Sequence, residues 1–173
     1  MVEPCTLLRD AGLVTLDAGG GIASWKAAID SSGGQAYVYL HEGEGQGTLA
    51  AARVVFARAT ADPESGIERV YDPSEIAALG GDPRAAFAIE AKPGLQLGSA
   101  CAGPYAGRAP AYPATHGYDP RRPELRASLL LHGPDVRHGT IHGARVVDIG
   151  PTIAAWLGLE MPGVDGRPIV VEP

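Results

Sequence analysis

The sequence has little of several features that would assign a protein class at once. It has no apolar run near the roughly 18 residues of a membrane-spanning helix, so we expect no membrane partner. It has no basic run, and its formal net charge is −6, which argues against binding to a nucleic-acid backbone. The first residues carry neither the basic flank nor the apolar core of a signal peptide, so the sequence alone predicts no compartment.

Cysteine is also scarce. The two cysteines, Cys5 and Cys101, lie far apart in the sequence. A single disulfide is one alternative, but buried thiols that do not pair are the interpretation that the sequence favours.

The composition otherwise suits a folded protein. Hydrophobic residues make up 45% and charged residues 20% of the 173 positions, which is normal for a globular chain. Glycine (24) and proline (15) are numerous and predict many turns between short elements. The length fits a single domain over residues 1–173 or a fragment of a larger domain.

Helical and strand patterns alternate along the chain. The patterns predict strands at 36–40, 67–71, 86–90 and 127–131 and helices at 4–13, 48–60, 73–79 and 151–157. Asp72 and Glu75 have the spacing of a capping box at the start of the third helix. The segment 127–131 is nearly all apolar, which is typical of a strand buried on both faces. The mixture predicts the α/β class.

A long segment without periodicity, residues 91–123, holds many of the glycines and prolines. Structureless stretches of this length inside a compact domain usually serve a function. The motif Thr115-His116-Gly117-Tyr118-Asp119 lies at its end.

Four further pieces follow this motif in order: the apolar segment that runs into Gly133-Pro134, then D-I-G-P-T at 148–152, L-G-L at 157–159 and D-G-R-P at 165–168. The ordered series resembles the C-terminal part of type I phosphodiesterases and nucleotide pyrophosphatases of the alkaline phosphatase superfamily. Residues 7–13 and 33–40 resemble earlier segments of the same family. The resemblance covers most of the chain and is densest from 113 to 168.

The resemblance implies a fold and an activity. The expected fold is the C-terminal part of an alkaline-phosphatase-like sandwich, in which helices surround a mostly parallel sheet. The expected activity is metal-dependent cleavage of phosphodiester or pyrophosphate bonds in small nucleotide-type substrates. Two zinc ions in the complete family site would clamp the phosphoryl oxygens and activate a Thr or Ser nucleophile. Phosphonoacetate hydrolases and phosphoglycerate mutases are related families that this segment barely separates from the first.

By the resemblance, His116 is the last ligand of the two-zinc site. A neutral imidazole on a loop rich in glycine and proline can reach a metal that carboxylates at strand ends also bind. Without the resemblance, a single loop histidine is more often a surface residue. Tyr118 and Asp119 either order the loop around the metal or simply form a turn at Asp119-Pro120.

The other polar residues of this region are left outside the site. His132, His138 and His142 are each followed by glycine, so we expect them on loops or at the surface. Asp148 is interpreted as a helix cap and Asp165 as a turn residue.

The chain also departs from the family. The nucleophile and the other metal ligands have no counterpart in residues 1–173. We therefore expect a hydrolase fragment that is inactive alone, binds zinc weakly and self-associates through an exposed segment 127–131. The alternative is a stand-alone α/β module that binds or assembles without catalysis.

Overall fold

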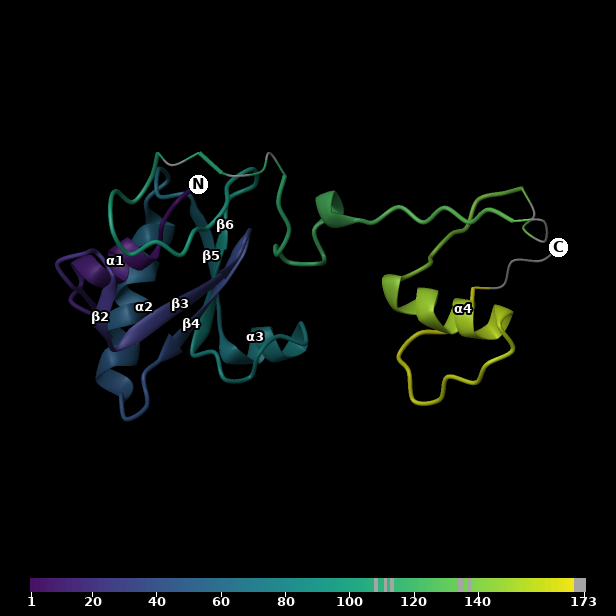
Figure 1. Cartoon of the computed structure of the whole chain (residues 1–173), viewed down its shortest axis with the longest axis horizontal. Coiled ribbons are helices and arrows are strands. Elements are labelled where there is room, and N and C mark those ends of the chain that lie inside the picture. Colours follow the sequence, from purple (N-terminus) through teal and green to yellow (C-terminus); the bar gives the residue numbers. More distant parts are fainter. Residues whose placement is uncertain (108, 111, 113, 134–135, 137, 170–173) are drawn as a thin grey trace. The chain divides into compact units, whose positions relative to one another are not determined.

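The computed structural model describes residues 1–169 except 108, 111, 113, 134, 135 and 137, and Figure 1 shows its elements. The chain divides into two compact units, Met1–Leu125 and Arg126–Pro173, each of which is considered by itself. The helices are α1 (Cys5–Asp10), α2 (Gln46–Ala61), α3 (Pro73–Ala78) and α4 (Ile149–Trp156), with two 3₁₀ helices, η1 (Pro123–Leu125) and η2 (Val146–Asp148). The strands are β1 (Val14–Leu16), β2 (Ile22–Trp25), β3 (Ala27–Ser32), β4 (Gln35–Leu40), β5 (Ile67–Tyr71) and β6 (Phe87–Ala91).

Most of the predicted elements form where the sequence placed them. All four predicted helices are present, and so are the strands predicted at 36–40, 67–71 and 86–90, which are β4, β5 and β6. The capping box at the start of α3 is also confirmed, because the Asp72 backbone amide donates to Glu75 at 2.9 Å. The α/β class is therefore correct.

The expectation of a mostly parallel sheet is wrong for the described residues. The four-stranded sheet has the order β3-β4-β6-β5, and every neighbouring pair in it is antiparallel. The small β1-β2 sheet is antiparallel as well. The physical reason lies partly in β3, which turns tightly at Gly33 (φ +74°) into β4 as a hairpin. Its sequence, A-A-I-D-S-S, has little strand propensity and did not predict a strand.

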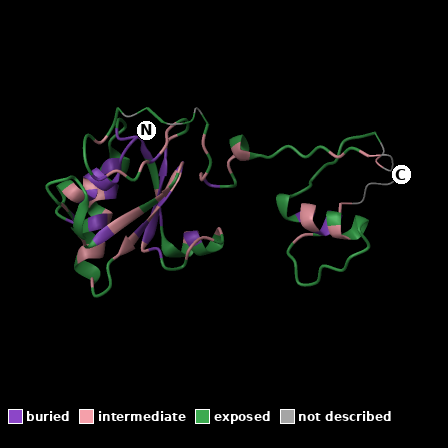
Figure 2. Ribbon diagram, viewed as in Figure 1, coloured by how far each residue is buried: buried purple, intermediate pink, exposed green. Residues whose placement is uncertain are grey.

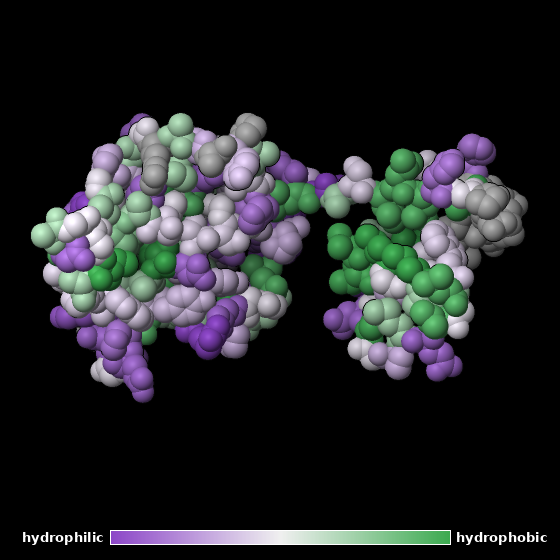
Figure 3. Space-filling model, viewed as in Figure 1, coloured by the Kyte–Doolittle hydropathy of each residue, from purple (hydrophilic) through white to green (hydrophobic). Residues whose placement is uncertain are grey.

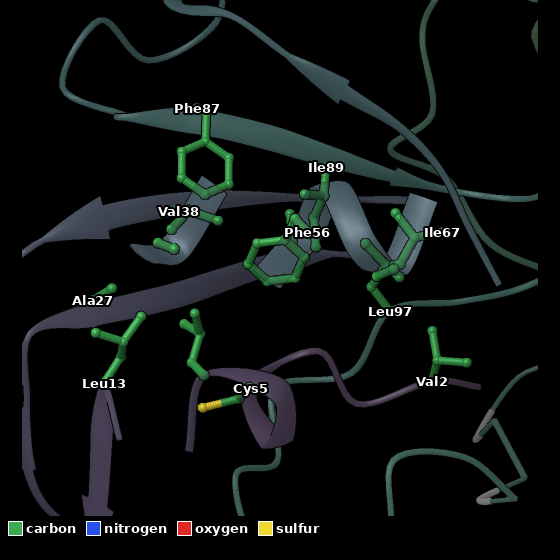
Figure 4. Packing of buried hydrophobic residues seen from close by; sticks show 14 of the residues in the cluster. Val2, Cys5, Leu13, Ala27, Val38, Phe56, Ile67, Phe87, Ile89 and Leu97 are labelled. Carbon is green, nitrogen blue, oxygen red and sulfur yellow. The ribbon is translucent and has the colours of Figure 1, made fainter. Parts of the chain in front are cut away.

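The main core lies between one face of this sheet and helix α2. Phe56 from α2 meets Phe87 from β6 edge to face, with ring centroids 5.7 Å apart (Figure 4). Val38 and Ile89 lie on the same face, and α1 adds Leu8. These fully buried side chains give unit 1 a hydrophobic core of its own.

The second face of the sheet carries a smaller apolar cluster and a buried charge. Ile76 of α3 packs with Tyr71 and Ala88. Alternate residues of a strand point to opposite faces, so Ala88 and Glu90 of β6 share this second face while Phe87 and Ile89 face α2. Glu90 is therefore a carboxylate in the interior of a strand that is buried along its whole length.

The cysteines do not remain separate thiols, so that expectation is wrong. Cys5 and Cys101 form a disulfide, and both residues are buried. Hydrogen bonds also join residues 2–9 to residues 96–105. The Val2 amide donates to the Gln96 carbonyl, the Glu3 amide to the Tyr105 carbonyl and the Arg9 guanidinium to the Cys101 carbonyl. A distance of 96 residues along the sequence gave no indication of this proximity.

Unit 2 has a polar centre. Asp148 is buried and accepts the backbone amides of Arg145 (2.8 Å) and Arg167 (3.0 Å). The Thr152 hydroxyl donates to the Asp148 carbonyl and accepts the Ile169 amide. Asp148 precedes α4, but its side chain does not cap that helix as expected; its carboxylate closes η2 instead.

The apolar side chains of unit 2 lie largely at its surface (Figures 2 and 3). Of the fourteen large apolar side chains that the described residues expose, eleven fall between Leu129 and Val164. The strand predicted at 127–131 is wrong: this segment has no regular structure, and Leu130 is 90% exposed. Among the described residues, none forms a main-chain hydrogen bond with the backbone of residues 127–131. An apolar segment becomes a stable strand only where a sheet offers it neighbours.

Candidate functional site

Residues 115–118 lie against the β3–β4 hairpin in unit 1, and we call residues 115–119 the His116 loop. The Gly34 amide donates to the His116 carbonyl at 2.7 Å. The imidazole itself is exposed, and no described residue hydrogen-bonds to it. The backbone of His116 is therefore fixed to the sheet while its side chain stays free to bind something else.

Three glycines make this close approach feasible. A Cβ on Gly33 would lie 2.6 Å from the His116 carbonyl oxygen, and one on Gly34 would lie 2.5 Å from Tyr118 Cγ. Gly117 has φ +85°, and a Cβ there would overlap the Ser32 carbonyl group, whose carbon would be only 2.9 Å away. Real side chains essentially never approach this closely, so loop and hairpin depend on glycine on both sides of the contact.

Tyr118 holds the next position of the loop. Its ring packs at the edge of the main core, and its hydroxyl donates to the Leu95 carbonyl. The Arg122 guanidinium lies 5.6 Å from the centre of its ring. Burial raises the pKa of the Tyr118 hydroxyl, which therefore stays protonated as a donor at neutral pH. Of the two interpretations of Tyr118, ordering of the loop is what these contacts support.

Asp119 enters a buried polar cluster on the second face of the sheet. Its backbone amide donates to Glu90 Oε1 at 2.9 Å. Glu90 Oε1 also accepts Arg122 Nε at 2.7 Å, and Glu90 Oε2 accepts the Tyr71 hydroxyl. The Asp119 carboxylate forms a two-pronged pair with the Arg121 guanidinium. We call Tyr71, Glu90, Asp119, Arg121 and Arg122 the Glu90 cluster.

The charges of the Glu90 cluster stabilise one another. Hydrogen bonds from Arg121 hold the pKa of Asp119 well below its usual range, so that carboxylate is ionised at neutral pH. Burial, with the neighbouring Glu90 carboxylate, raises the pKa of Tyr71. The Tyr71 hydroxyl thus stays protonated and donates a hydrogen bond to the Glu90 carboxylate. Arg69 lies over the Tyr71 ring, with its guanidinium carbon 4.4 Å from the ring centre.

A pocket of about 580 Å³ opens above the Glu90 cluster. The buried members of the cluster form its floor, and surface arginines and glutamates form its rim. The residues that line it are Glu68, Arg69, Tyr71, Glu75, Ala78, Glu90, Asp119, Arg121 and Arg122. Each arginine at the rim, Arg69, Arg121 and Arg122, already pairs with a carboxylate. We therefore interpret the Glu90 cluster as holding the His116 loop in place rather than as binding a ligand.

The described residues do not form a metal site by themselves. Among them, no group of three or more His, Cys, Asp or Glu side chains gathers closely enough to hold an ion. Zinc sites in proteins use three or four protein ligands, and the described residues gather no such set around His116. His132, His138 and His142 are exposed and lie outside helices and strands. Asp165 lies in a bend and contributes its carbonyl to Arg145.

Sequence reasoning missed three of the residues that position the His116 loop: Tyr71, Glu90 and Arg122. One signal was available, because Glu90 interrupts an otherwise apolar strand, F-A-I-E-A, without alternation. A charge in such a strand indicates a buried partner. The partners themselves, 19 and 32 residues away, could not be identified from the pattern.

Comparison of the chain with protein-family models, with curated proteins and with solved structures gave no match. None of the helices in the described part of the chain has the length and hydropathy of a membrane span.

Proposed function

We propose that the chain is the C-terminal segment of a metal-dependent hydrolase of phosphodiester or pyrophosphate bonds, with nucleotide-type substrates. In this proposal His116 supplies one zinc ligand, and the nucleophile and the remaining ligands come from polypeptide outside residues 1–173. The substrate is then a small phosphodiester or nucleotide. The chain alone is inactive.

One observation carries the proposal: the backbone that carries an exposed imidazole is fixed at two points, at His116 itself and at Asp119. The Gly34 amide holds the His116 carbonyl, and Glu90 holds the Asp119 amide three residues later. A ligand residue loses less conformational freedom on binding when its backbone is already ordered. Exposure of the ring leaves both nitrogens available to groups outside the described residues.

The exposed apolar surface of unit 2 supports the fragment interpretation. Unit 2 buries polar groups and exposes leucine, valine and tryptophan side chains, the reverse of a soluble domain. Contiguous exposed apolar patches mark surfaces that another protein layer covers. The missing part of a larger enzyme would be such a layer.

A decisive test restores the coding sequence upstream of Met1 and measures hydrolysis of bis-p-nitrophenyl phosphate together with bound zinc. His116→Ala should lower activity at least about 100-fold, since even residues that only support a metal ligand typically contribute about 10–100-fold. His132→Ala is the matched control, because it removes the same imidazole beside a glycine, and it should change activity less than about threefold. Retention of zinc and activity by His116→Ala would refute the proposed role.

The 173-residue chain alone provides a second test. It should not hydrolyse the same substrate with zinc present, because neither a nucleophile nor a sufficient ligand set is available. Zinc-dependent turnover above that of His116→Ala would show that the chain contains a complete site.

A non-catalytic module is the second candidate function. Both faces of the unit 1 sheet are covered, by α2 and by α3, and the unit has its own core, as an independent binding or assembly module requires. The upstream coding sequence separates the candidates. An open frame that encodes an Asp-His metal motif favours the hydrolase, and a promoter with a ribosome-binding site at Met1 favours the module.

A further inference from the structure

Glu90 is a buried charge that apolar packing alone does not require. It is 1% exposed, and its neighbours in β6 are Phe, Ala and Ile. Burial of a carboxylate and its cation is often no more stabilising than an apolar pair of the same shape. A buried ion pair is therefore better explained by the geometry it imposes than by the stability it adds.

The contacts of Glu90 lead to one segment of the chain. Oε1 accepts the Asp119 amide at 2.9 Å and Arg122 Nε at 2.7 Å, so a single oxygen binds two points of the residues that follow His116. Oε2 accepts the hydroxyl of Tyr71 from the neighbouring strand β5, which fixes the rotamer of the carboxylate. The carboxylate thus joins β6 to the loop with its own orientation set by β5.

We propose that Glu90 is a positioning residue for His116. The β3–β4 hairpin fixes the loop at the His116 carbonyl, and Glu90 fixes it three residues later at the Asp119 amide. With two fixed points this close, the sheet sets the backbone conformation at His116 and so the direction of its Cα–Cβ bond. The consequence for catalysis rests on the proposed function, whereas the positioning itself concerns this chain alone.

The experiment measures amide hydrogen exchange by NMR in the 173-residue chain. Glu90→Gln keeps the shape of the side chain but removes the charge that binds Arg122. Exchange of the Asp119 amide and of residues 115–118 should rise about tenfold or more, as expected from losing one or two charge-assisted hydrogen bonds. Amides of the β3–β4 pair, such as Val38, should change less than about threefold.

Two further variants keep the inference testable. Glu68→Gln removes the other carboxylate that binds Arg122, one exposed at the surface, and should leave the loop unchanged. Arg122→Met leaves Glu90 in place and removes the cation, so it should loosen the loop in the same direction even if Glu90→Gln fails to fold. A uniform loss of protection, or an unchanged loop in both Glu90→Gln and Arg122→Met, would overturn the inference.

The same variants distinguish this inference from the proposed function. In the longer polypeptide, Glu90→Gln should lower zinc affinity about tenfold while His116 is present and should have no further effect in His116→Ala. If the loop loosens but His116→Ala keeps its zinc, positioning is correct and the metal role is wrong. If zinc binding requires His116 but amide exchange in the His116 loop is unchanged by Glu90→Gln, the metal role is correct and the positioning role of Glu90 is wrong.

Discussion

Substitution of Gly117 tests how tightly the His116 loop is seated on the hairpin. In Gly117→Ala, two terms oppose the native conformation. A left-handed backbone at φ +85° costs an L-residue about 1–2 kcal/mol. The new Cβ also overlaps the Ser32 carbonyl group, so the loop must move away from the hairpin and the 2.7 Å bond from the Gly34 amide to His116 must break. A donor left without a partner costs about 1–3 kcal/mol more.

Gly43→Ala is the matched control. Gly43 has φ +87°, nearly the angle of Gly117, but a Cβ there meets nothing within 4 Å. It should therefore cost only the backbone term, about 1–2 kcal/mol. The two variants should therefore differ in unfolding free energy by about 1–3 kcal/mol, which is the contribution of the contact between the His116 loop and the hairpin.

Urea unfolding followed by tryptophan fluorescence measures this difference. The two tryptophans lie in different units, Trp25 in β2 and Trp156 at the end of α4. Trp156 is 53% exposed, so Trp156→Phe should disturb little and leaves Trp25 to report on unit 1. With a slope of about 1–3 kcal/mol per molar urea, the two midpoints should differ by about 1 M. Equal midpoints within error would show that the loop does not lie on the hairpin as described.

Three further predictions concern other parts of the chain. Replacing Cys5 and Cys101 together by alanine should lower the unfolding free energy of unit 1 by up to about 4–5 kcal/mol in urea titrations, from closure of a loop of 96 residues; a loss below about 1 kcal/mol would contradict it. The chain should self-associate at about 100 μM in sedimentation, and Leu130→Ser should weaken this association, whereas a wild-type monomer would argue against an uncovered apolar surface. Hydrogen bonds from the Arg167 and Arg145 amides lower the pKa of Asp148 to about 2, so its contribution to unit 2 is complete above about pH 4 and is lost as the pH falls through 2. The amide NMR shift of Arg167 should follow that titration, and Asp148→Asn should abolish it.

The sequence predicted those elements whose signals are local. Alanine-rich periodicity marked α2, and the Asp72–Glu75 spacing marked α3, because caps and propensities act over a few residues. Strands β4, β5 and β6 had enough β-branched or aromatic residues to stand out. Strand β3 did not, because its six residues become a strand only by pairing with β4.

The candidate site was predictable in part. His116 could be singled out from its motif and its Gly/Pro-rich surroundings, and its role stays a prediction. The features that hold its loop are long-range: Gly33 and Gly34 lie about 80 residues earlier in the chain, and Glu90 lies 29 residues before Asp119. Local patterns mark these glycines as turn residues, but only the folded chain brings them against the loop. The disulfide escaped prediction for the same reason.

The failure of the strand predicted at 127–131 is informative in its own right. The pattern A-S-L-L-L correctly describes what these residues need, namely neighbours on both edges and cover on both faces. Within the described part of unit 2, no strand supplies such neighbours, so the backbone of this segment has no main-chain hydrogen bond there and Leu130 is exposed. Unit 2 has 48 residues, a size at which a single small core rarely suffices, and its buried centre is polar. Local preference and the structure of this chain disagree here, whereas in unit 1 they mostly agree. Agreement between the two levels is the mark of a self-sufficient fold, and unit 1 shows this agreement whereas residues 127–131 of unit 2 do not.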